Sequence, residues 1–286
     1  MVLAALHRTG PTCMITTLCG TPASLLGLAA HPAQNPQCIW RAFESGINFF
    51  FFYSPGHRLF VEGLKSLVRQ RRGEMILASG SGSRSNKGLR AARQKILSAV
   101  GIESIDIFFA EYINPSDNVD AVFGNGGVLD ELQQWKANGW IRFVGASAHD
   151  RNLANRLAKD ARVDVLMHRY NMAHRKAAHE VFPAAIKTQT PVVAFTATRW
   201  GTLLKLNPEW PSGPPTAADC YRYCLAHPAV DLVLTAPESI AELADNVGVL
   251  KSPPMSDPVC DHWERYGDII YKHGRGAAHD YESRWP

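Results

Sequence analysis

Three side chains capable of acid–base chemistry lie at or just beyond the ends of apolar segments in this 286-residue chain: Glu111, Tyr53 and His57. Glu111 ends the run Ile105–Glu111, where removal from water penalises the carboxylate and raises its pKa. A carboxyl group with a raised pKa suits a general acid or base. Tyr53 ends the run Asn48–Tyr53, and its phenol is a second candidate for the same task. His57 follows on the next loop, so the sequence predicts a catalytic site built from these three residues.

Each of these residues also has a purely structural interpretation. Tyr53 would then be a wall of the pocket and His57 an exposed loop residue. Glu111 would form an ion pair with an arginine, for which the candidates are Arg142, Arg169 and Arg199.

Short β-rich apolar runs alternate with longer segments of helical periodicity along most of the chain. The predicted strands are Met14–Cys19, Asn48–Tyr53, Met75–Ser79, Ile105–Glu111, Ile141–Ser147, Val163–His168, Val192–Thr196 and Asp231–Thr235. Predicted helices between them include His57–Arg71, Lys87–Val100, Val128–Asn138, Asn152–Lys159 and Ile240–Leu250. Eight strands that alternate with helices indicate an α/β fold, one (β/α)8 TIM barrel over residues 1–250. We expect residues 251–286 to be a C-terminal extension that packs on the barrel, across its mouth or along its side.

A doubly wound sheet is the competing fold, but no GxGxxG follows the first predicted strand, and Gly80-Ser81-Gly82 is too short for that fingerprint. In (β/α)8 barrels, the C-terminal ends of the strands and the loops after them build the active site. We therefore expect His149 and Trp200 to lie at the same mouth as Glu111 and Tyr53.

The composition excludes several classes of protein. The chain is 46% hydrophobic and 20% charged, which is typical of a globular domain. The net charge of +4 comes from scattered basic residues, so no nucleic-acid partner is expected. No apolar run is long enough for a transmembrane helix, and His7, Arg8 and Thr9 interrupt any signal peptide, which predicts a cytoplasmic protein without membrane contact. The six dispersed cysteines are expected to be free thiols. No metal site is expected, because the first predicted strand lacks an HxH pair.

Several motifs in the same order along the chain resemble the aldo-keto reductase family. The second predicted strand, with its glycine, aliphatic residue, asparagine and two aromatics, is similar to the family's second strand. The other matching segments are Arg8-Thr9-Gly10, Ser104–Phe109, Gly139–Ser147, Arg169-Tyr170-Asn171, Val193–Thr196 and Ser239–Asn246. The chain is identified as a divergent member of this family, and the resemblance implies the same barrel.

The family's catalytic tetrad of Asp, Tyr, Lys and His is degenerate in this sequence. The resemblance puts Phe51 at the aspartate position, Gly80 at the lysine position and Glu111 at the histidine position. The tyrosine position falls near residues 56–57, so Tyr53 matches it only if the loop has shifted. Replacing the lysine–aspartate pair by Gly80 and Phe51 removes both charges together, which avoids an unpaired buried charge.

The resemblance also implies contacts with a nicotinamide cofactor, either NADP or NAD. The matching positions are Ser147, Phe195, Thr196, Ser239 and Asn246. Ala148 and Met167 replace the two amides that hold the carboxamide in the family. Glu238 stands where a basic residue is usual, so NADPH is expected to bind weakly unless Arg199 or Lys205 compensates.

Three functions remain open on the sequence. The first is an atypical aldo-keto reductase that binds a nicotinamide cofactor and a small carbonyl or imine substrate. The second is a barrel repurposed for redox-neutral acid–base chemistry, such as a lyase, cyclase or isomerase, with no nicotinamide. The third is a non-catalytic binding or regulatory protein. The sequence leaves the oligomeric state open.

Overall fold

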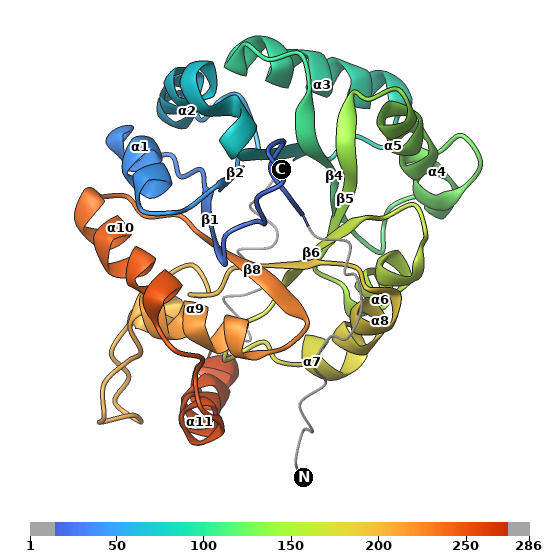
Figure 1. Cartoon of the computed structure of the whole chain (residues 1–286). Helices are drawn as coiled ribbons and strands as arrows, with labels where there is room; N and C mark the ends of the chain where they lie inside the picture. Colours follow the sequence, from blue (N-terminus) through green and yellow to red (C-terminus); the bar gives the residue numbers. More distant parts are fainter. Residues whose placement is uncertain (1–14, 274–286) are drawn as a thin grey trace.

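The computed structural model describes residues 15–273 and is a closed barrel of eight parallel strands (Figure 1). Each strand pairs with the next, and β8 closes on β1. The strands are β1 Leu26–Ala29, β2 Phe49–Phe51, β3 Ile76–Ser81, β4 Ile105–Ile113, β5 Ile141–Ala148, β6 Val165–Arg169, β7 Val192–Phe195 and β8 Val230–Thr235. The predicted (β/α)8 barrel is therefore confirmed.

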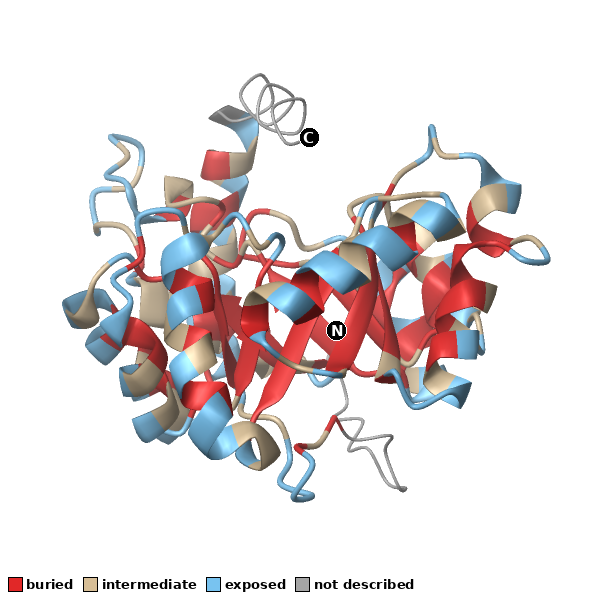
Figure 2. Cartoon of the chain, turned by 90° about the horizontal axis from the view of Figure 1, so that it is seen from above, coloured by how far each residue is buried: buried red, intermediate tan, exposed pale blue. Residues whose placement is uncertain are grey.

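Helices cover the outside of the barrel and turn their buried faces to the strands (Figure 2). Their bounds are α1 Gln37–Glu44, α2 Arg58–Arg71, α3 Asn86–Val100, α4 Val119–Phe123, α5 Val128–Ala137, α6 Arg151–Lys159, α7 Ala177–Glu180, α8 Phe182–Thr188, α9 Ala217–Ala226, α10 Ile240–Val247 and α11 Asp257–His273. The five helices named from the sequence match α2, α3, α5, α6 and α10 to within a few residues at either end.

The first barrel strand is not the predicted segment Met14–Cys19 but Leu26–Ala29. The described part of the predicted segment turns back on itself, and Thr16 forms an antiparallel bridge with Pro22. Arg142, at the start of β5, donates to the Thr16 carbonyl oxygen at 2.6 Å and so fixes this turn at the N-terminal end of the barrel. The segment has the apolar pattern of a strand because Ile15 packs into the bottom of the barrel, as a strand residue would.

The five consecutive aromatics of β2 and its flanks divide between two cores. Phe49 and Phe51 point into the barrel, whereas Phe50 and Phe52 pack outward against the helices. This period-2 alternation is the property of a strand buried on both faces. Gly27 of β1 leaves room for the inner layer, since a Cβ there would lie 2.8 Å from the Phe49 ring.

Helix α3 is well defined at both ends. The Ser85 hydroxyl oxygen accepts from the Gly88 N–H at 3.2 Å, which caps the N-terminus. Gly101 ends the helix with φ of 79°, a left-handed conformation that glycine adopts without a Cβ penalty. Residues on the inner face of this helix line a cavity at the barrel mouth.

The described part of the C-terminal extension forms α11, which lies outside the ring of barrel helices near α9 (Figure 1). The Tyr266 hydroxyl donates to the carbonyl oxygens of Leu203 and Lys205, both at 3.0 Å. Arg175 forms an ion pair with Asp268 at 2.8 Å. These contacts fasten α11 to the loops that follow β6 and β7. Within residues 15–273, no helix is long and apolar enough to cross a membrane.

Candidate active site

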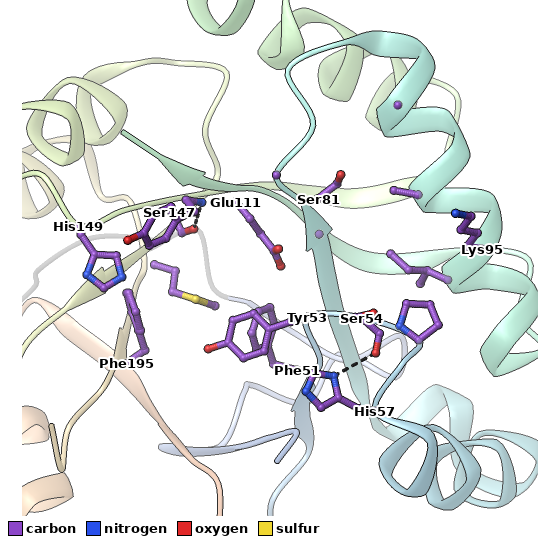
Figure 3. A pocket seen from close by; sticks show the side chains of 18 of the residues that line it. Phe51, Tyr53, Ser54, His57, Ser81, Lys95, Glu111, Ser147, His149 and Phe195 are labelled. Carbon is purple, nitrogen blue, oxygen red and sulfur yellow. Dashed lines mark hydrogen bonds between the residues drawn. The ribbon is translucent and has the colours of Figure 1, made fainter. Parts of the chain in front are cut away.

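A cavity of about 760 Å³ opens at the C-terminal ends of the strands, within the size range of small-molecule sites (Figure 3). It is lined by Phe51, Tyr53, Ser54, Pro55, His57, Gly80, Ser81, Gly82, Gly88, Ala91, Ala92, Lys95, Ile96, Glu111, Tyr112, Ser147, His149, Met167, Phe195, Thr196 and Trp200. The three residues predicted to be catalytic are thus brought together, and so are His149 and Trp200. Ser147, Phe195 and Thr196 share the same cavity.

Glu111 lies near the end of β4, and its side chain points into the cavity (Figure 3). Its Oε1 atom is buried and has no hydrogen-bond partner among the described residues. Burial raises the pKa of this carboxyl group to about 8, and the charge of Arg84 opposes part of the rise. At neutral pH the neutral acid is therefore the dominant form, and it has a proton to give.

Arg84 holds the backbone on which Glu111 is mounted. Its guanidinium donates to the carbonyl oxygens of Glu111 and Tyr112, both at 2.9 Å, and pairs with Asp117 at 2.8 Å. Tyr112 has a φ of 53°, a conformation unusual for a non-glycine residue. The contacts of Arg84 stabilise this turn of β4 and fix the direction in which the Glu111 side chain leaves it.

The structural interpretation of Glu111 is wrong for two of its proposed partners. Arg142 lies at the opposite end of the barrel, where it pairs with Asp106 at 3.0 Å. Arg199 is 4% exposed and donates to the Ile270 carbonyl oxygen at 2.7 Å. Arg169 is not among the residues that line the cavity.

Tyr53 faces Glu111 across the centre of the cavity (Figure 3). Its ring meets that of Phe51 edge to face, with centroids 4.7 Å apart and planes at 80°. Phe51 in turn packs against Phe109 in the barrel below. Removal from bulk water raises the pKa of the Tyr53 phenol, and the nearby charge of ionised Glu111 raises it further. The phenol therefore stays protonated and is able to donate a hydrogen bond.

His57 lies on the rim of the same cavity, directly before α2. Its Nδ1 is 3.1 Å from the Ser54 carbonyl oxygen, so a proton on Nδ1 would make that hydrogen bond. Its ring centroid is 6.2 Å from that of Tyr53. The imidazole is thus a neighbour of the phenol on the solvent side.

The other side of the cavity is formed by β5, β6 and β7. His149 and Phe195 meet edge to face, with ring centroids 4.9 Å apart. Burial lowers the pKa of His149 to about 3, and the charge of Arg169 adds to the effect, so the ring is neutral at physiological pH. His149 Nδ1 and Thr196 Oγ1 are buried and have no hydrogen-bond partner among the described residues. The Ser147 hydroxyl oxygen accepts from the Tyr112 N–H at 2.8 Å, which leaves the hydroxyl hydrogen free to donate.

Ser239 and Asn246 lie outside the cavity lining, on α10. The Ser239 hydroxyl oxygen accepts from the Glu242 N–H at 3.1 Å and caps the helix. The Asn246 amide donates to the Thr235 hydroxyl at 3.0 Å and is 5% exposed. Both side chains are therefore engaged in the barrel's own structure at the far end of the predicted cofactor path.

Sequence reasoning missed two cationic side chains of this region, Arg84 and Lys95. No motif marks Arg84, because its partners are backbone carbonyls 27 and 28 residues away. Lys95 stands on the same helical face as Gly88, Ala91 and Ala92, and that spacing was the available signal. Within residues 15–273, no group of three or more His, Cys, Asp or Glu side chains could hold a metal ion.

An eight-stranded barrel with one cavity wall of acid–base groups and another of aromatic and hydroxyl groups defines a (β/α)8 protein with a small-molecule site at its mouth. The sequence profile of the aldo/keto reductase family matches residues 32–214, more than half of the chain. The chain belongs to the aldo/keto reductase family.

Individual relatives are distant. D-threo-aldose 1-dehydrogenase of a Pseudomonas species is 24% identical over 127 residues, which are 44% of this chain and 38% of that protein. The chain therefore matches well under half of that curated relative. Aldo-keto reductase AKR11C1 from Bacillus halodurans is similar in structure. Its holo form superposes with a TM-score of 0.73 at 19% identity, over 89% of this chain and 96% of that one. Its apo form gives 0.69 at 19% identity, over 88% and 94%. At a sequence identity of 19%, the structural similarity shows a shared fold only.

Proposed function

We propose that the protein is an atypical oxidoreductase that reduces a small carbonyl or imine compound with a nicotinamide cofactor, without the family's usual tetrad. The observation that carries the proposal is the unpartnered Glu111 Oε1 beside the Tyr53 phenol, opposite the aromatic wall of Phe195. Family membership and the name of the dehydrogenase relative support redox chemistry. The largely apolar lining favours a carbonyl compound with fewer hydroxyl groups than the aldose in that relative's name.

The nicotinamide half of the cofactor fits the wall formed by β5 and β7. Phe195 offers an aromatic face, and the Ser147 hydroxyl keeps a hydrogen to donate to a carboxamide oxygen. His149 Nδ1 and Thr196 Oγ1, which have no partner among residues 15–273, would each gain a hydrogen bond that these residues do not provide. When bound, a reduced nicotinamide would supply the hydride for the carbonyl carbon.

Reduction of a carbonyl also needs one proton at the oxygen, and Glu111 is suited to give it. Its pKa of about 8 leaves it protonated at neutral pH and close enough to ambient pH for proton transfer. The C=O bond loses its π component as the oxygen accepts the proton, and Glu111 is left as the carboxylate. Solvent then returns a proton to Glu111 before the next turnover.

Tyr53 and His57 complete the arrangement in this proposal. The phenol of Tyr53 remains protonated and donates a hydrogen bond that orients the carbonyl oxygen toward Glu111. His57, on the rim beside Tyr53, connects the site to solvent and returns the proton. Phe51 and Phe109 beneath the phenol exclude water from the reacting atoms.

The cofactor in this proposal is NAD rather than NADP. Glu238 lies on the loop before α10, where its carboxylate would repel a 2′-phosphate. Among residues 15–273, its carboxylate pairs with the His31 imidazole, at 3.7 Å. Arg199 is unable to compensate, because its guanidinium is buried against the Ile270 carbonyl oxygen.

Redox-neutral chemistry is the second candidate, and one observation favours it. Glu111 has a pKa near ambient pH and faces the protonated Tyr53 phenol in an apolar cavity, so a lyase, cyclase or isomerase could use the carboxyl group as acid or base and the phenol as hydrogen-bond donor, without a nicotinamide. In that case the unpartnered groups around Phe195 would bind substrate instead of cofactor.

Cofactor titration distinguishes the two candidates. NADH and NADPH are titrated separately into the purified chain, with tryptophan fluorescence as the readout because Trp200 lines the cavity. Saturable binding of NADH that is weakened in Phe195→Ala, and not in the exposed control Leu206→Ala, supports the oxidoreductase. No binding of either nucleotide at millimolar concentration contradicts it and leaves the redox-neutral candidate.

A further inference from the structure

The cavity continues beyond the Glu111–Tyr53 pair to the inner face of α3, away from Phe195 and His149 (Figure 3). We call this part the α3 lobe. It is lined by Ser54, Pro55, Ser81, Gly82, Gly88, Ala91, Ala92, Lys95 and Ile96. A bound nicotinamide on the Phe195 wall and a carbonyl at Glu111 would leave this lobe empty, so it is available to the rest of a substrate.

Small side chains create the lobe. Gly88, Ala91 and Ala92 follow the i, i+3, i+4 spacing of one helical face. The short side chains of Ala91 and Ala92 keep α3 from filling the space beside β3, and Gly88 makes room for the Ser83 side chain, which a Cβ there would meet. A Cβ added to Gly82 would meet no atom within 4 Å, so the floor of the lobe is open as well. Pro55 and Ile96 give the remaining wall an apolar surface suited to an aliphatic chain.

The cavity has an acidic side chain where the α3 lobe begins and a basic side chain at the far end of the lobe. Glu111 is the only acidic side chain among the described residues that line the cavity, and Lys95 is the only lysine or arginine. Lys95 is exposed and makes no hydrogen bond or ion pair with another residue in the 15–273 range. Its ammonium group lies at the far end of the α3 lobe (Figure 3).

Two hydroxyl groups line the way from Glu111 to Lys95. The Ser54 oxygen accepts from the Gly56 N–H, and the Ser81 oxygen accepts from the Ser83 N–H, both at 3.1 Å. Each hydroxyl hydrogen therefore remains available to donate to an anion. A negatively charged group in the lobe would meet an ammonium and hydroxyl donors, and the described residues that line the lobe include no carboxylate.

We infer that the α3 lobe is a specificity subsite for a substrate whose carbonyl lies at Glu111 and whose aliphatic chain ends in a carboxylate bound by Lys95. The substrate class is an ω-oxo carboxylic acid. The inference rests on the proposed function for the position of the carbonyl, but recognition of the carboxylate depends only on the cavity and Lys95.

Equilibrium binding tests the subsite without turnover or cofactor. Calorimetric titration compares straight-chain ω-hydroxy carboxylates, which are the reduction products, with the α,ω-diols of the same length. The acids are expected to bind about tenfold tighter than the diols, as for a hydrogen bond to a charged group. Lys95→Met should remove this preference, whereas Lys87→Met, an exposed lysine on α3 outside the cavity, should keep it.

A second variant tests the space rather than the charge. Ala91→Phe fills the lobe from an exposed helical position, and it should weaken the binding of the acids and of the diols alike. Equal affinity of acids and diols, or an acid preference that survives Lys95→Met, overturns the subsite. Failure of NADH to bind while the acid preference persists overturns the oxidoreductase proposal and leaves the subsite standing.

Discussion

The Glu111 side chain of β4 occupies the space that a side chain on Gly80 of β3 would need. A Cβ on Gly80 would lie 2.8 Å from Glu111 Cγ and would also press on the Phe109 carbonyl oxygen. The Glu111 side chain can follow its path into the cavity only because residue 80 has no side chain. A lysine at position 80 would compete with it for the same volume. A glycine at position 80 and the observed path of the Glu111 side chain are therefore structurally coupled.

Gly80→Ala is expected to destabilise the protein by about 1–3 kcal/mol, as overpacking of a close-packed site does. The added methyl group has rigid backbone on one side and Glu111 on the other, so the strands must separate. The matched control is Gly82→Ala two residues on, where a Cβ meets no atom within 4 Å. Urea denaturation of both variants measures the difference, and equal midpoints would show that β3 and β4 are not in close contact here.

The raised pKa of Glu111 predicts a dependence of stability on pH. The folded protein holds a proton on Glu111 up to about pH 8, whereas the unfolded chain loses it near pH 4.5. Because the native state binds more protons in this window, this contribution to stability is full below the lower value and is lost as pH rises. The loss approaches about 1.4 kcal/mol per pH unit inside the window.

Glu111→Gln should flatten this part of the stability profile. Denaturation curves at several pH values from 5 to 8 (a window set by the pKa of about 8) compare the two proteins. The same variant is expected to lower kcat about a hundredfold or more if Glu111 is the proton donor. An unaltered slope with pH would mean that Glu111 is ionised in the folded protein.

Asp106 predicts a stability effect far from the cavity. Its carboxylate is fully buried, accepts from the Leu77 N–H at 2.8 Å, and pairs with Arg72 at 2.8 Å and Arg142 at 3.0 Å. Asp106→Ala should cost about 3 kcal/mol, because it leaves partly buried cations and an amide without their acceptor. Glu74→Ala removes an exposed ion pair to Arg71 and should change the free energy of unfolding by less than about 1 kcal/mol.

The barrel was predictable because each strand after the first carries its own apolar signal. Leu26–Ala29 escaped because it is short and contains Gly27, while the turn before it contributes Ile15 to the same core. Glu111 was predictable because a charged residue at the end of a buried strand must lie at the barrel mouth.

The groups that position Glu111 were beyond sequence reasoning for a physical reason. Arg84 acts through backbone carbonyls, and Tyr112 adopts a positive φ, neither of which a side-chain pattern encodes. Ser239 and Asn246 show the converse. Their residue types match a cofactor loop, but their polar atoms bond to Glu242 and Thr235 within the barrel. A residue type therefore states which hydrogen bonds are possible, and only the packing decides which are made.

Glu238→Arg should reverse the proposed preference for NADH over NADPH. The substitution removes a carboxylate that would repel the 2′-phosphate and adds a guanidinium that can bind it in bidentate fashion. Glu238 is exposed, and among the described residues its carboxylate pairs only with the His31 imidazole, at 3.7 Å, so the change should leave the melting temperature nearly constant. The Kd for NADPH is expected to fall about tenfold or more, while that for NADH changes little. Asp245→Arg, at an exposed position further along α10, makes the same change of charge and is the control for a general gain of positive charge. Equal gains in both variants would show that the residue at position 238 does not face the phosphate.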